Sequence, residues 1–113
     1  MLAQRANLTI HQGDDYAAAV LVTDASGNAV DLTGYTIASE IRRGIADNNP
    51  DIVLTISTSV TLPNTINLGI SHTDTADLTG PYLWDLELVT PAGTHTTILT
   101  GKVVIQREVT VMA

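Results

Sequence analysis

Apolar and polar residues alternate with a period of two along much of this chain, and the longest such stretch covers residues 80–110. A period of two is typical of a β-strand with one buried and one wet face. Asp85 and Glu87 fall on the polar face. The apolar face holds Tyr82, Trp84, Leu86 and Leu88. Because Trp84 is the only tryptophan, we expect the largest single apolar burial here.

A second strand is expected to return along the first. Pro91 and Gly93 supply the turn, since Pro fixes φ and Gly tolerates a positive φ. Val103 and Ile105 then carry the apolar face onward, and Gly101 predicts a bulge or a bend in this arm. We expect the rest of the chain to pack onto this hairpin.

Five further strands follow from the same pattern. They are expected at residues 5–12, 16–23, 35–43, 52–56 and 66–70, and residues 29–32 are expected to return briefly along 16–23. The near-continuous apolar run at 16–23 predicts a fully buried strand. Turns are expected at 13–15, 24–28 and 62–64, and a polar loop at 44–50. Residues 71–78 predict at most one short helical turn, with Ser71 as its cap and Asp74 three residues later.

A short motif occurs twice: Asp31-Leu32-Thr33-Gly34 returns as Asp77-Leu78-Thr79-Gly80. Each copy ends a loop and leads into an alternating strand. The physical reading is a leucine that closes one end of the core and a glycine that lets the chain turn into the sheet. Duplication and chance reuse both explain so short a match.

Together these elements give about seven or eight short strands with regularly spaced turns, which predicts an all-β fold. We expect residues 1–113 to form a single antiparallel β-sandwich of the immunoglobulin-like kind. A small closed barrel is the alternative. The length of 113 residues fits one domain, and 44% hydrophobic residues suffice for one core.

Charge and composition exclude several classes of partner. The net charge is −7, with only five Lys and Arg, whereas a nucleic-acid binder needs cations to neutralise phosphates. The apolar run at 17–22 is too short to span a bilayer, so no membrane contact is expected. The chain has no Cys and hence no thiol chemistry.

No pattern of catalytic or metal-binding residues emerges. His11, His72 and His95 are far apart in sequence and read as surface residues. Residues 24–28 have oxygen side chains at alternate positions, but a plain hairpin turn explains them better than calcium does. Paired carboxylates can perform acid–base chemistry, but Asp85 and Glu87 are expected to face solvent. We therefore expect a non-enzyme without cofactor or metal, and no small-molecule ligand.

Placed on these strands, the chain resembles small phage and prophage virion proteins with an all-β domain, notably the N-terminal domain of siphophage baseplate upper proteins. The resemblance runs through most of the chain, although that family usually has a second aromatic where Trp84 stands. It rests on Gln12-Gly13-Asp14-Asp15, residues 24–27, Asp31-Leu32-Thr33-Gly34, Ile41-Arg42, Gly80, Tyr82, Trp84-Asp85-Leu86-Glu87, Gly93, Gly101-Lys102-Val103 and Glu108-Val109-Thr110.

The resemblance implies a structural role in the virion, after synthesis in the host cytoplasm: a tail or baseplate adaptor or a connector component. The partners would be further copies of the chain, in a homo-oligomer, and another tail or capsid protein. Tyr35, Arg42, Arg43 and the 44–50 loop are the expected contact surface.

Two other functions stay open. Since the chain ends at Ala113, without the long extension that carries a fibre or receptor-binding module, a capsid cement or decoration protein is one alternative. A surface carbohydrate-binding module, with its tyrosines as stacking platforms, is the other, although aromatic content is only 4%.

Overall fold

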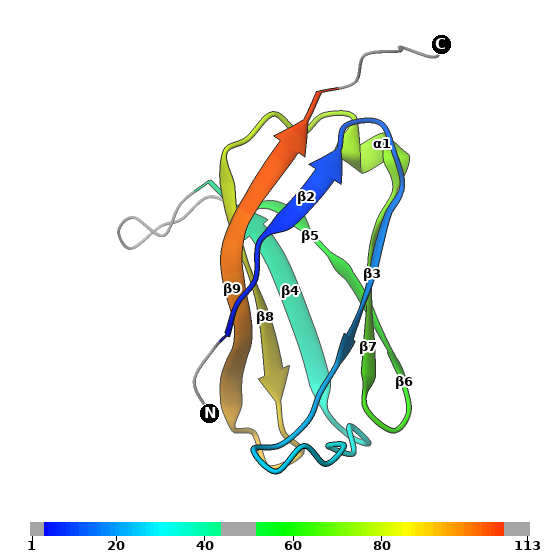
Figure 1. Ribbon diagram of the computed structural model, residues 1–113, viewed down its shortest axis with the longest axis vertical. Helices are drawn as coiled ribbons and strands as arrows, with labels where there is room; N and C mark the ends of the chain where they lie inside the picture. The colour runs from blue at the N-terminus through cyan, green and yellow to red at the C-terminus, as the bar shows by residue number, and fades with distance from the viewer. Residues whose placement is uncertain (1–3, 44–51, 108–113) are drawn as a thin grey trace.

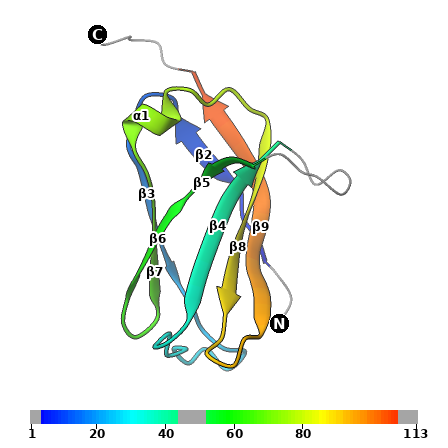
Figure 2. The same cartoon turned by 180° about the vertical axis from the view of Figure 1, so that it is seen from behind.

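The computed structural model describes residues 4–43 and 52–107, and they form a β-sandwich of two packed sheets (Figures 1 and 2). The larger sheet has the order β1-β9-β8-β4-β5, with β2 also on β9, and the smaller has the order β3-β7-β6. The strands are β1 (Gln4–Arg5), β2 (Leu8–His11), β3 (Tyr16–Leu21), β4 (Thr36–Arg42), β5 (Ile52–Thr55), β6 (Ser57–Thr61), β7 (Thr65–Ile70), β8 (Tyr82–Val89) and β9 (His95–Gln106).

The all-β sandwich expected from the sequence is thus confirmed. One feature differs from a purely antiparallel sandwich, because β1 and β2 both pair with β9 in parallel. The order β9-β8-β4-β5 facing β3-β7-β6 corresponds to the GFCC′ and BED strands of variable-type immunoglobulin domains. This order supports the immunoglobulin-like interpretation, which stays a prediction.

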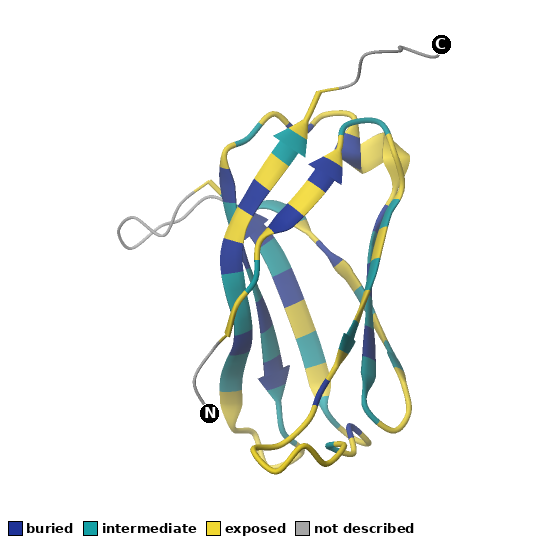
Figure 3. Cartoon of the chain, viewed as in Figure 1, coloured by how far each residue is buried: buried dark blue, intermediate teal, exposed yellow. Residues whose placement is uncertain are grey.

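The β8–β9 hairpin lies at the centre of the larger sheet, as expected. Along β8 the inward side chains are buried and the outward ones half-buried, which is the alternation read from the sequence (Figure 3). Trp84 is 3% exposed and Leu86 fully buried. The core between the sheets consists of Ile, Leu and Val packed around this indole.

Gly101 makes room for the first strand. It faces Trp84 across the β8–β9 ladder. A Cβ at Gly101 would overlap the carbonyl oxygen of Ala6, in the kink between β1 and β2. The Trp84 indole passes this point and donates Nε1–H to that same oxygen at 2.7 Å. The bulge expected at Gly101 is therefore wrong: the ladder shifts between Leu86 and Glu87, and Gly101 instead permits a close backbone approach.

One strand prediction needs correction, and one strand was missed. Residues 16–23 are not a fully buried strand: β3 lies at the edge of the smaller sheet, and its residues alternate between half-buried and exposed. The strand expected at 52–56 is present as β5, but β6 was not predicted: the chain leaves the larger sheet after β5 and joins the smaller one as β6. Ile56, at the crossing, is 1% exposed and donates its amide to Ser39 O.

The repeated motif acts as expected at both positions. Leu32 and Leu78 are 2% and 3% exposed, and each belongs to the core. Gly34 and Gly80 have φ angles of 81° and 73°, in the region that favours glycine. The expected helical turn is also present as α1 (His72–Thr75), and Ser71 caps it by accepting a hydrogen bond from the Asp74 amide.

Candidate interaction surfaces

The outer face of the larger sheet carries a row of cations beside a row of acids. Register places Arg42 opposite Leu83, and Leu83 opposite Lys102, so these three side chains form one row across β4, β8 and β9. The next row is Glu40, Asp85 and Thr100. Positive and negative charges that are dispersed in the sequence are therefore adjacent on this face.

A groove with an apolar floor opens at the cationic end of this face. Its volume is about 560 Å³. Val104 in its floor is 47% exposed, which is unusual for a β-branched apolar side chain. Exposed Arg43 and Lys102 flank it, and neither forms an ion pair with any described residue. The groove is lined by Arg43, Thr79, Gly80, Pro81, Tyr82, Leu83, Lys102, Val103, Val104 and Ile105.

The acidic part of the face is already engaged within the chain. Glu40 pairs with Arg42 at 2.6 Å, and Glu87 with His95 at 2.6 Å. Burial raises the pKa of Asp85, and the neighbouring charges of Glu40 and Glu87 raise it further. Asp85 therefore resists ionisation more than an ordinary surface carboxyl, although it faces outward as expected.

The structure brings together two of the three predicted contact residues. Arg42 and Arg43 lie at the groove end of the outer face. Tyr35 is half-buried and precedes β4, so the strand separates it from Arg42 by about 23 Å at 3.3 Å per residue. The expected contact loop at 44–50 lies outside the described residues.

Sequence reasoning missed the remaining groove residues, above all Lys102 and Val104. A usable signal was present, because Leu83 and Val104 are large apolar residues at positions of the hairpin that alternate outward. Two outward-facing apolar residues beside a lysine are typical of an outer face that contacts a partner.

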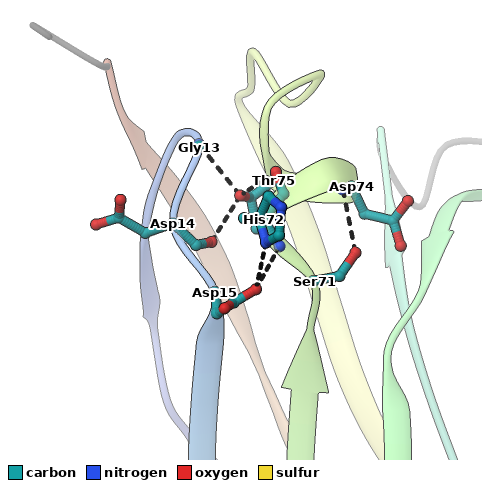
Figure 4. A network of polar contacts seen from close by, with 7 residues as sticks. All are labelled: Gly13, Asp14, Asp15, Ser71, His72, Asp74 and Thr75. Atoms are coloured by element: carbon teal, nitrogen blue, oxygen red, sulfur yellow. Dashed lines mark hydrogen bonds and ion pairs between the residues drawn. The ribbon is translucent and has the colours of Figure 1, made fainter. Parts of the chain in front are cut away.

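A polar network at one end of the sandwich fastens the β2–β3 turn to α1 (Figure 4). Thr75 is fully buried, and its hydroxyl donates to Asp14 O at 2.7 Å and accepts from the Gly13 amide at 3.2 Å. Asp15 Oδ1 accepts a hydrogen bond from the His72 amide at 2.6 Å and also contacts His72 Nδ1 at 3.0 Å. These hydrogen bonds give the residues of the network a structural role, which is to hold the β2–β3 turn against α1.

The three histidines lie at the surface of the described chain. All three are exposed, as predicted, and His72 and His95 each also have an acidic partner. The hydrogen bond from the His72 amide, followed by that from its ring, holds the pKa of Asp15 below its usual value. Among residues 4–43 and 52–107, no group of three or more metal-ligating side chains is positioned to hold an ion.

No protein-family model matches the chain, and no curated protein matches it significantly. Within the part of the chain that the structure describes, no helix has both the length and the apolar character needed to cross a bilayer.

Proposed function

We propose that this protein is a non-enzymatic structural component of a phage virion, acting as a tail or baseplate adaptor or as a connector component through protein–protein contacts. The observation that carries the proposal is the groove on the outer sheet face, where an apolar floor lies between two cations that form no ion pair with any described residue. Exposed apolar surface rimmed by charge is typical of a protein-binding site.

Charge specifies what the groove accepts. On a chain of net charge −7, Arg43 and Lys102 are two of only five basic residues, yet they flank the same groove. A partner segment with an apolar side chain for Val104 and carboxylates for the two cations would complement it. We assign that segment to another virion protein of the tail or the capsid.

The experiment follows incorporation of the chain into particles. A tagged chain is expressed in the strain that encodes it, particles are induced and purified by density, and the tag is quantified per particle. We expect the wild-type chain to be present in stoichiometric amounts. Its absence from purified particles would overturn the virion role.

Two charge reversals test the groove in the same assay. Lys102→Glu places an acid beside Val104 and should reduce incorporation at least tenfold, because it repels an acidic partner. Arg5→Glu makes the same change of charge on exposed β1, beside Thr100 in the next row of the face and outside the groove lining, and should leave incorporation unchanged. Equal loss from both variants would implicate net charge and contradict the groove.

The same particles distinguish the alternative roles. Signal in tail-only fractions supports the adaptor, whereas signal in isolated heads supports a capsid cement or decoration protein. A carbohydrate-binding module would instead show glycan-array binding that is lost on substitution of a tyrosine. Tyr82 does not suit that role, since it is 5% exposed and its hydroxyl accepts from the Thr79 amide at 2.9 Å.

A further inference from the structure

The edge of the smaller sheet is open along β3. This strand pairs with β7 on one side, and no described residue pairs with it as a strand on the other (Figure 1). The Val22 amide donates to Asn64 O at 2.9 Å, on the side of β7. Because main-chain groups alternate in direction along a strand, those of Ala17, Ala19 and Leu21 point away from β7.

Nothing in the sequence of β3 protects this edge. Natural edge strands are commonly blocked by a charge, a proline or a bulge. Residues 16–23 contain no charged residue and no proline, and the β3–β7 register is continuous from Tyr16 to Leu21. Ala17 and Ala19 are exposed, and Leu21 is 70% exposed.

An apolar opening lies beside the same edge. It has a volume of about 510 Å³ and separates β3 from the strands of the other sheet. Val20 and Val22 line it from the side of β3, and Ile98 and Leu99 line it from β9. A strand added to β3 would therefore gain main-chain hydrogen bonds and also cover apolar surface.

We propose that the occupant of this edge is β3 of a second copy of the chain. The two strands pair antiparallel about a two-fold axis that passes between the two copies of Ala19. An antiparallel strand pair is compatible with such an axis, so one strand can be its own partner. Centring on Ala19 pairs it with its own equivalent, and each Ala17 with Leu21. The main-chain groups of Ala17, Ala19 and Leu21 that point away from β7 are then all hydrogen-bonded. The two smaller sheets join into one continuous six-stranded sheet across the dimer.

This register also places a side chain at the mouth of the opening. It sets Tyr16 of the second copy opposite Val22, with Cβ atoms about 5 Å apart, at the mouth of the apolar gap. One like-charge pair arises at each end, between Asp14 and Asp24. The Asp24 carboxylate is already turned into its own hairpin, where it accepts from the Ser26 and Asn28 amides at 2.9 and 3.0 Å.

The inference rests on the proposed function in taking assembly as the role of the protein, and it names the first partner as an identical chain. Cysteine cross-linking tests the register, since the chain has no native Cys. In Ala19→Cys the two cysteines are directly opposed, with Cα atoms about 5.5 Å apart, within disulfide range. In Ala17→Cys the equivalent residues are four positions out of register, about 13 Å apart.

We expect Ala19→Cys to form a covalent dimer on mild oxidation, at least tenfold faster than Ala17→Cys. Because both side chains are exposed, random collision would cross-link the two variants at the same rate. Equal rates would therefore overturn the proposal. Sedimentation of the unmodified protein gives a second readout. A wild-type chain that stays monomeric at 100 µM or above would also overturn it.

Ala19→Pro completes the test. The Ala19 amide points away from β7, so proline at this position removes no hydrogen bond of the folded chain. We expect this variant to be monomeric with an unchanged circular-dichroism spectrum, and Ala19→Val to remain dimeric. A dimer in Ala19→Pro would refute pairing through β3. Its incorporation into particles is measured separately, so failure of the dimer and failure of the virion role are distinguishable.

Discussion

Replacing Gly101 with alanine tests the contact that joins the first strand to the core. The added Cβ would overlap the Ala6 carbonyl oxygen and lie 2.7 Å from the Ala6 carbonyl carbon. Real Cβ atoms do not approach backbone so closely, so the β1–β2 kink must move outward. The Ala6 carbonyl oxygen then loses the hydrogen bond that it accepts from the Trp84 indole N–H, which measures 2.7 Å in the wild type.

The expected cost follows from the hydrogen bonds that this displacement breaks. An indole N–H left buried without a partner costs about 1–3 kcal/mol. The bonds from Ala6 N to Thr100 O and from Lys102 N to Asn7 Oδ1 are lost with it, at about 1 kcal/mol each. We therefore expect Gly101→Ala to lower the free energy of unfolding by about 3 kcal/mol or more, a large part of the 5–15 kcal/mol typical of a domain.

Urea unfolding followed by Trp84 fluorescence measures this change, because the chain has a single tryptophan. Gly69→Ala is the matched control: Gly69 also lies within a strand, and the nearest atom to its added Cβ is Tyr16 O at 3.9 Å. Alanine there should be neutral or stabilising by up to about 1 kcal/mol. A cost below about 1 kcal/mol for Gly101→Ala, with unchanged native emission, would refute this account of the glycine.

Two further substitutions address the polar groups. Thr75→Val keeps the shape of a fully buried side chain but leaves Asp14 O and the Gly13 amide without their partner, so thermal or urea unfolding should show a loss of about 1–3 kcal/mol; no loss would contradict the role of this hydroxyl as a fastening. Asp85→Asn should stabilise the protein at pH 7, because burial and two neighbouring acids raise the pKa of Asp85 and so penalise its ionised form in the folded state. The gain develops as pH rises from the unfolded pKa of about 3.9 through the raised folded pKa, and vanishes below both; urea titrations at pH 3.5 and pH 7 that gave the same difference would disprove this origin.

The sequence predicts the hairpin and most strand positions because those signals are local. Alternation from Tyr82 to Leu88 needs only the nearest neighbours, and the two Asp-Leu-Thr-Gly motifs each contain both the core leucine and the turn glycine. The crossing at Ile56 is not visible in this way. Its buried side chain continues the alternation of β5, although the chain there passes into the other sheet.

Edge position and face chemistry depend on pairing between distant strands. The apolar run of β3 suggests a central strand, but an edge strand rich in alanine has the same pattern. The groove arises because register aligns Arg42, Leu83 and Lys102, which are far apart in the sequence. Lys102 therefore could not be joined to Arg42 and Arg43 from composition or spacing.

The parallel pairing of β1 and β2 with β9 has a mechanical consequence. Gln4 lies against Leu99 and His11 against Gln106, so the described chain starts and finishes at opposite poles of the same ladder. Tension applied between these poles acts along the strands and shears all of the ladder's hydrogen bonds together, instead of peeling them apart one after another. The sandwich is thus arranged to withstand stretching along its long axis.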